Sequence, residues 1–387
     1  MGDGPTASRK EMIHMDPIER AGTLKSRLVR FALSRRFERE LSAVFEREFP
    51  GGVVHDEGVV SLVIDHFALQ HRLADGDTVV DRFVAARPKL SAEDRDMLLG
   101  WKDVVEGVFE VKQRNGDTLT LFNLIDELTY STRSNVGAKA FRSIRKGMFL
   151  VGRCVPLGSG WMLSGNPAAF PARSRDVVLG QAAELVTRNP QAAFRNPDKL
   201  SAARRMLAEQ REIFIGLYQE DFIVVPASEL DEHLNAFWSA VAAKARPGDR
   251  SSQRALLGFS AETEDADTVA IHFDPDTGLG FFLDFGLLED LFADPALIAR
   301  RRYRETLTDY LRDDDVSPIP IRRLAERDPD RASTVFRKLL KKRDFVWETH
   351  GEALLREHKA RYFDTPRLPG SVPVSEEMAA YLRSLNP

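Results

Sequence analysis

The stretch EGVFEVKQRNGDTLTLFNLIDELTYSTRS (residues 106–134) decides the fold of this chain. Apolar and polar residues alternate along it in three runs, and Asn115-Gly116-Asp117 separates the first run from the second. Alternation with a period of two is typical of strands that are buried on one face, and Asn-Gly favours a tight hairpin turn. The stretch therefore predicts three consecutive strands.

Two later runs extend this β segment. They read RKGMFLVGRCVPL (residues 145–157) and GWMLSGN (residues 160–166), and are rich in β-branched and aromatic residues with glycines between them. Glycines at such positions suit the corners of a closed barrel. We predict a small β-barrel over residues 106–170, like an OB or SH3 barrel. Two roles stay open for it: a binding face, or a structural connector between helical units.

Helical periodicity dominates on both sides of this segment, so the predicted class is α+β, mostly helical, with a central barrel and a separate hairpin. The strand FIVVP (residues 222–226) and the turn at Pro275-Asp276-Thr277-Gly278 mark the second β region. The predicted organisation is a disordered N-terminus at 1–16, a helical domain at 17–105, the barrel at 106–170, an α/β region at 171–290 with a mobile linker at 246–262 and a hairpin at 268–286, and a helical C-terminal region at 291–387.

Composition narrows the function classes. The 387 residues carry a net charge of −4, so the protein as a whole has no cationic field that would attract nucleic acid. Cys154 is the one cysteine of the chain, which excludes an internal disulfide, and its apolar surroundings predict a buried thiol. Apolar runs are shorter than the roughly 18 residues that cross a bilayer, and the N-terminus lacks the apolar core of a secretory signal. We expect a cytoplasmic protein without a membrane partner.

Basic residues gather locally in RASTVFRKLLKKR (residues 331–343), where an apolar stripe would leave four cations facing solvent. Aromatic and basic side chains on one barrel face could likewise stack bases and neutralise phosphates. For the helix, the alternative is that its cations face the acidic hairpin or are solvated; for the barrel, the alternative is a structural connector. The residues of this hypothesis are Arg133, Arg145 and Lys146, with Tyr130 and Phe122, on the barrel, and Arg337, Lys338, Lys341 and Lys342 on the later helix.

Acidic residues around the hairpin support a second hypothesis, a metal-dependent enzyme in which Asp274, Asp276 and Asp284 bind a divalent cation. The spacing of the first two resembles the start of a calcium loop, but the twelfth loop position is Phe285, where an EF-hand has glutamate. Asp284-Phe285-Gly286 matches the kinase tripeptide without the catalytic and glycine-rich loops that precede it in kinases. A hairpin turn explains the same residues.

Sequence motifs of common enzymes are absent: the chain has no P-loop, Rossmann glycine pattern, HExxH, nucleophile elbow or CxxC. We therefore predict no catalytic residue and no cofactor. The leading expectation is a non-enzymatic interaction protein with a protein or nucleic acid as its partner. The oligomeric state stays open.

The passages LSAEDRDMLLGWKDVVEGVFEV (residues 90–111) and KGMFLVGRCVPLGSGWMLSGN (residues 146–166) resemble a family of uncharacterised bacterial proteins. In that family a helix ending in Trp-(Lys/Arg)-Asp leads into a small barrel ending in Leu-Ser-Gly. Some proteins with a similar segment carry a C-terminal cysteine-rich metal motif, but this chain lacks those cysteines. The resemblance covers about residues 90–170 and implies a domain layout, without an activity or catalytic residues.

Overall fold

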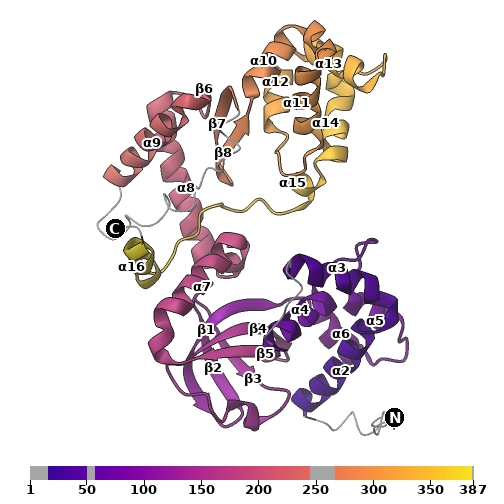
Figure 1. Cartoon of the computed structure of the whole chain (residues 1–387), viewed down its shortest axis with the longest axis vertical. Helices are drawn as coiled ribbons and strands as arrows, with labels where there is room; N and C mark the ends of the chain where they lie inside the picture. The colour runs from indigo at the N-terminus through magenta and orange to yellow at the C-terminus, as the bar shows by residue number, and fades with distance from the viewer. Residues whose placement is uncertain (1–15, 50–56, 245–265, 386–387) are drawn as a thin grey trace. The chain divides into compact units, whose positions relative to one another are not determined.

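The computed structural model describes residues 16–49, 57–244 and 266–385, and its contacts divide the chain into two compact units, Met1–Asn196 and Pro197–Pro387 (Figure 1). The predicted mixture of helices and strands is confirmed. The expected linker at 246–262 and nearly all of the expected disordered N-terminus at 1–16 lie outside the described residues.

The first unit opens with helices whose starts follow from their capping residues. Asp16 accepts a hydrogen bond from the amide of Ile18, and Thr78 forms a capping box with Asp81. Ser91 accepts from the amide of Asp94, as its position before an apolar run predicts. The helices are α2 (Pro17–Ala32), α3 (Glu38–Glu48), α4 (Glu57–Leu69), α5 (Val79–Ala85) and α6 (Ala92–Gly100).

Five strands of the first unit pair in a closed ring in the order β1-β2-β3-β5-β4. All neighbours are antiparallel except β3 and β5, which pair in parallel. The alternation read from the sequence is seen in β2, whose residues are buried at every second position. The strands are β1 (Val105–Asn115), β2 (Thr118–Asn123), β3 (Thr129–Arg133), β4 (Phe149–Leu157) and β5 (Gly160–Phe170), with a short 3₁₀ turn, η2 (Ala138–Phe141), between β3 and β4.

Helices cover this barrel from several directions. α4 packs on β5, α2 and α6 on β4, and α7 (Arg175–Arg188) on β1 and β4. With the 3₁₀ turn η4 (Pro190–Arg195), α7 belongs to the first unit, although the sequence pattern placed both in the region 171–290. The barrel is thus enclosed within one unit that ends at residue 196.

The second unit starts with a three-stranded antiparallel sheet of order β6-β7-β8. β6 (Phe222–Pro226) is the strand expected there, and β7 (Thr268–Asp274) with β8 (Gly278–Leu283) forms the expected hairpin. α8 (Pro197–Tyr218) and α9 (Leu230–Lys244) share an aromatic core with β7, in which Phe214 and Phe237 contact Phe273.

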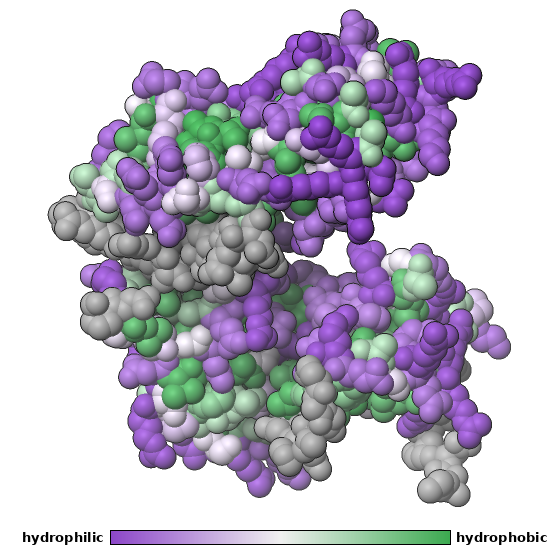
Figure 2. All heavy atoms as spheres, turned by 45° about the horizontal axis from the view of Figure 1, so that its top comes forward, coloured by the Kyte–Doolittle hydropathy of each residue, from purple (hydrophilic) through white to green (hydrophobic). Residues whose placement is uncertain are grey.

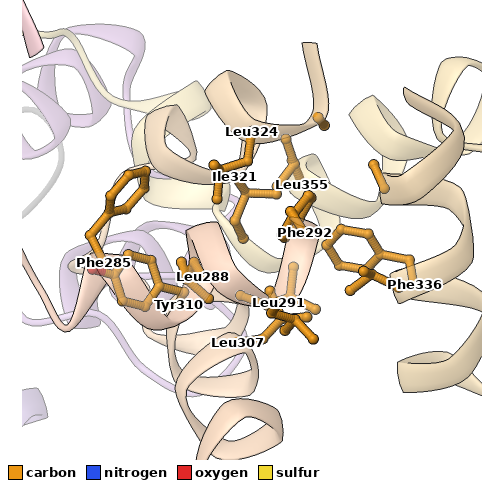
Figure 3. Close-up of a cluster of buried hydrophobic side chains, with 14 of the residues drawn as sticks. Phe285, Leu288, Leu291, Phe292, Leu307, Tyr310, Ile321, Leu324, Phe336 and Leu355 are labelled. Carbon is orange, nitrogen blue, oxygen red and sulfur yellow. The ribbon is translucent and has the colours of Figure 1, made fainter. Parts of the chain in front are cut away.

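A helical bundle completes the second unit. Side chains from α10 through α14 converge on one apolar core (Figure 3). Figure 2 shows the part of the molecule that holds these helices covered mostly by hydrophilic residues on its visible face. The helices are α10 (Phe285–Ala293), α11 (Arg301–Arg312), α12 (Ile319–Arg327), α13 (Pro329–Leu340), α14 (Trp347–His358), α15 (Ala360–Asp364) and α16 (Glu376–Leu385).

Phe336 is the residue whose truncation tests this core. Its ring is fully buried and stacks on Trp347 with centroids 5.0 Å apart. Replacing it with alanine should lower the free energy of unfolding of the second unit by about 3–5 kcal/mol, because the substitution loses apolar burial and leaves a cavity. Urea denaturation measures this. The control Leu217→Ala, at a side chain that is 43% exposed, should change stability by less than about 0.5 kcal/mol. Equal effects of the two substitutions would contradict this description of the core.

Candidate functional site

A cavity of about 1130 Å³ lies in the first unit. α2 and α4 form one side of it, and the segment 134–144 with parts of β4 and β5 forms the other. Small-molecule sites commonly occupy about 300–1,000 Å³, so this space is large enough for an organic ligand. Apolar side chains reach solvent among its lining residues, since Leu33 is 50% exposed and Val136 is 69% exposed.

An irregular strand pairing shapes one wall of this cavity. Val151 pairs with Ala168 and Arg153 with Ser164, so one residue of β4 faces three residues of β5, Gly165 to Pro167. These three bulged residues all line the cavity. Bulges of this kind re-aim side chains and often lie beside functional sites.

Gly165 lets α4 lie close to this bulge. Its φ of +74° is in the left-handed region, and a Cβ there would lie 3.1 Å from Cδ2 of Leu62 on α4. The backbone angle therefore favours glycine, and a larger residue would also require the Leu62 side chain to shift. The Leu-Ser-Gly sequence of β5 thus lies against α4, which carries Asp65, the partner of the charged residue described next.

Lys25 projects from α2 into this region although it is 7% exposed. Its Nζ lies 2.5 Å from Oδ1 of Asp65 on α4 and 5.5 Å from the ring centroid of Trp101. Burial lowers the pKa of Lys25 below its ordinary value, and the Asp65 charge opposes this shift. The Nζ atom itself is inaccessible to solvent, and Asp65 is its ion-pair partner.

Asp65 is the shared partner of the cavity's buried polar groups. Its Oδ2 accepts from Nε of Arg153 at 3.0 Å, and its Oδ1 accepts from Oγ of Ser164 at 2.6 Å. Arg153 also donates to Oε1 of Gln70 at 2.5 Å. Burial alone would raise the pKa of Asp65, but the charges of Lys25 and Arg153 outweigh it and lower that pKa. The carboxylate is therefore charged, and two groups besides Lys25 hold it.

The charges that line the cavity sum to a positive value. Lys25 and Arg30 are cationic and Asp65 is anionic, which gives 2 − 1 = +1. Arg153 adds a further positive charge behind Asp65, where Glu106 lies 3.9 Å away with a side chain that is 52% exposed. Water screens the exposed charges of Glu106 and Arg30, so the buried charges are the cations Lys25 and Arg153 with the anion Asp65.

This site was not predicted from the sequence, although a signal for it exists. Lys25 is adjacent to Leu24 in the apolar stripe of its helix, Asp65 follows Ile64 in an apolar run, and Arg153 interrupts FLVGRCVPL. Charged residues within apolar runs are rarely buried without partners. Three such interruptions were therefore a sign of a buried ion network, but nothing in the sequence indicates which of them meet.

The cations predicted for nucleic-acid contact have mixed surroundings. Arg133 pairs with Asp16 at 2.9 Å and with Asp117 at 2.7 Å, and Tyr130 is 3% exposed, with its hydroxyl donating to Asp126. Three of the other cations donate hydrogen bonds to backbone carbonyls of the protein: Arg145 to Arg142 and Ile144, Arg337 to Phe345, and Lys338 to Pro295. The side chains of Lys146, Lys341 and Lys342 are exposed.

The three predicted metal ligands do not meet. Asp274 ends β7 and Asp276 lies within the hairpin turn, and both pair with Arg367. Asp284 lies beyond the other end of β8, about 20 Å away at roughly 3.3 Å per residue. Throughout residues 16–49, 57–244 and 266–385, no group of three His, Cys, Asp or Glu side chains could hold a metal ion.

Substitutions at Lys25 and Asp65 should have unequal effects on folding. Asp65→Asn leaves Lys25 and Arg153 buried without a counter-charge, and should lower the free energy of unfolding by about 3–5 kcal/mol. Lys25→Met leaves Asp65 held by Arg153 and Ser164, and should change the free energy of unfolding by less than about 1 kcal/mol. Urea denaturation of both variants measures this difference. A Lys25→Met variant as unstable as Asp65→Asn would show that the lysine serves the fold.

The environment of Asp274 predicts that the stability of the second unit depends on pH. Burial opposes its ionisation, but hydrogen bonds from His272 and from the amides of Asp276 and Thr277, with the Arg367 charge, lower its pKa well below 3.8. A carboxyl group whose pKa is lowered by folding contributes its full stabilisation when the pH is above the pKa of the unfolded chain. This contribution is lost as the pH falls below that pKa. Between pH 5 and 2, the melting temperature should therefore fall more steeply for the wild type than for Asp274→Asn.

Calorimetry over this pH range provides the measurement. Asp344→Asn, at an exposed aspartate of the same unit, is the matched control and should follow the wild type. Parallel pH curves for Asp274→Asn and the wild type would rule out a stabilising role for the ionised Asp274.

Comparison with known proteins concerns the first unit. No curated protein and no solved structure matches the chain. In the part of the chain that the structure describes, every helix is too short or too polar to cross a membrane. Residues 24–196 match the model of a family of unknown function (DUF7986), which confirms the resemblance to an uncharacterised family and extends it from α2 to the end of the first unit.

Proposed function

We propose that residues 16–196 form a binding module that takes a small organic ligand into the cavity between α2, α4 and the barrel. The observation that carries this proposal is a space of about 1130 Å³ whose lining combines apolar side chains with the polar side chains of several serines and asparagines. Small-molecule sites combine an apolar lining with a few polar groups that orient the ligand.

The sequence motifs behind the family resemblance support this location. Trp101, from the Trp-Lys-Asp motif, lies against the Lys25 ammonium, and Ser164, from the Leu-Ser-Gly motif, donates to Asp65. Gly165 of the second motif permits the approach of α4. Both motifs thus converge on the same ion pair, which favours a site built by the matched segment rather than by the second unit.

The strand order supports an OB-like identity for the barrel, because five strands close in a Greek-key arrangement with one parallel pair. OB barrels commonly bind through the face of strands 2 and 3. Here Tyr130 of β3 is buried and Arg133 is paired with two aspartates, so that face offers little for stacking bases. These contacts favour the cavity over nucleic-acid binding at the barrel face.

We also infer a reducing, cytoplasmic setting. Cys154 is a free cysteine buried within the barrel, and burial raises the pKa of its thiol to about 12. A protonated, inaccessible thiol has no role in disulfide exchange. A single cysteine that is buried and protonated forms no internal disulfide, and this supports the inference of a reducing compartment.

Ligand-observed NMR with a library of acidic, basic and neutral fragments tests the binding module. The wild type should bind several fragments that compete with one another. Ala140→Trp places an indole on an exposed residue that lines the cavity and should abolish this binding. Ala138→Trp, two residues earlier in η2, is exposed but does not line the cavity and should retain it.

This pair of variants isolates the cavity from general effects of an added indole. Circular dichroism of both proteins establishes that each is folded. A library without any bound fragment, or fragments whose binding survives Ala140→Trp, would refute the proposed function.

A further inference from the structure

We infer that the ligand of the cavity is a short acidic peptide in an extended conformation, whose backbone amides bind to the bulged segment of β5 and whose acidic side chains lie near Arg30. This inference rests on the proposed function, since it identifies the class of ligand for the same site. Three observations carry it: unpaired backbone groups in the cavity wall, exposed amide and hydroxyl side chains around them, and the distribution of charge around the cavity.

The bulge leaves part of the β5 backbone without a strand partner. Residues 165–167 face the single residue Gly152 of β4, and none of the three is paired with a residue of that strand. On the other edge of β5, the ladder with β3 ends at Met162. Within the described residues, no loop or turn hydrogen bond engages the backbone of 165–167 either. Bulged residues are left unpaired in this way, so the cavity wall carries backbone donors and acceptors that the sheet does not use.

This unpaired segment is accessible to a ligand. Gly165 and Asn166 are exposed, Pro167 is half-buried, and all three line the cavity. Extended peptides bind to unpaired strand backbone through main-chain hydrogen bonds. Leu163 and Ala169, the outermost lining residues of β5, are six positions apart, which corresponds to at most about 20 Å at roughly 3.3 Å per residue. A peptide of about six residues has this length.

Neutral polar side chains add further partners for peptide groups. Asn135, Ser143 and Asn166 are exposed lining residues, and in the part of the chain that the structure describes their side chains make no hydrogen bond. Ser26 is exposed as well, and its hydroxyl donates to the carbonyl of Gly22 but can still accept. A carboxamide carries both donors and acceptors, as a peptide group does. The lining can therefore bind a ligand that repeats N–H and C=O groups along its length.

Apolar lining residues suit the side chains of such a peptide. Leu33 is 50% exposed and Val136 is 69% exposed, so both offer apolar surface that is in contact with water. Successive side chains of an extended chain point to opposite sides, so one set can cover these residues while the other faces solvent. Phe141, the one aromatic residue of the described lining, is 2% exposed and cannot stack on a nucleobase.

The charges around the cavity favour an acidic peptide. Arg30 is exposed and lines the cavity, and no ion pair engages it within the described residues, whereas Lys25 and Asp65 pair with each other. Residues 20–37, which include most of α2, contain no acidic residue. Residues 134–146, on the other side of the cavity, hold four exposed cations and no acidic residue. This distribution attracts an anionic ligand and disfavours a cationic one.

Selection from a random peptide library tests the inference on the full-length protein. A displayed heptapeptide library is panned against the wild type after depletion on Ala140→Trp, in which an indole is placed in the cavity. Enriched sequences should carry net negative charge together with aliphatic residues. Synthetic peptides of the three most enriched sequences should bind the wild type at least about tenfold more tightly than Ala140→Trp, as measured by isothermal titration calorimetry.

Changes to the peptide and to the protein assign the contacts. N-methylation of single peptide bonds should weaken binding by about fivefold at one or more positions, because it removes a backbone donor. Replacing the acidic residues of the peptide with their amides, or Arg30 with methionine, should each weaken binding by about threefold to fivefold. The control Arg27→Met removes a cation of the same helix that does not line the cavity, and should stay within about twofold of the wild type.

Four outcomes would overturn the inference: no sequence enriched on the wild type over Ala140→Trp, enriched sequences without net negative charge, affinities that N-methylation leaves unchanged at every position, or affinities that neither Arg30→Met nor the amide peptides reduce. If fragments still compete for the cavity and Ala140→Trp abolishes their binding, the binding module stands and only its ligand class is wrong. Failure of the fragment experiment as well would refute the module itself.

Discussion

The buried carboxylate of Asp65 is the constraint on which the first unit depends. It joins α2, α4, β4 and β5, because Lys25, Arg153 and Ser164 all contact it. Charges inside a protein are tolerated only when partners replace the water that they lose. Elements that are 40 and 88 residues from Asp65 along the chain must therefore come together for this group to be buried at all.

An irregular part of the barrel lies directly beside this ion network. The bulge in β5 and the residue that it faces, Gly152, disturb the ladder directly beside Arg153. A Cβ at Gly152 would lie 2.8 Å from the Cβ of Pro167, so the bulged chain can pack there only against glycine. The irregular segment then forms the cavity wall. An ordinary ladder would leave the bulged residues paired and the space beside α4 closed.

Local patterns in the sequence predicted the strands well and the site poorly. Alternation in residues 106–134 and the Asp-rich turn of the hairpin depend on neighbours in sequence, which is why the strands of both sheets could be anticipated. Lys25, Asp65 and Arg153 become partners only through packing, so no spacing rule connects them. The expected length of β8 already indicates from the sequence that Asp284 lies far from Asp274 and Asp276. A strand of that length cannot bring its two ends together.

Lys25 then stands out because two other groups also hold its carboxylate partner. Arg153 and Ser164 already satisfy Asp65, and an unbranched apolar side chain of similar length would fill the same space beside Trp101. Burying an ammonium in that position costs desolvation energy that such a side chain would avoid. Residues that break the local rule in this way are concentrated where a protein binds or reacts. The two sequence motifs that contribute Trp101 and Ser164 thus meet at one ion pair, in the wall of a space large enough for a ligand.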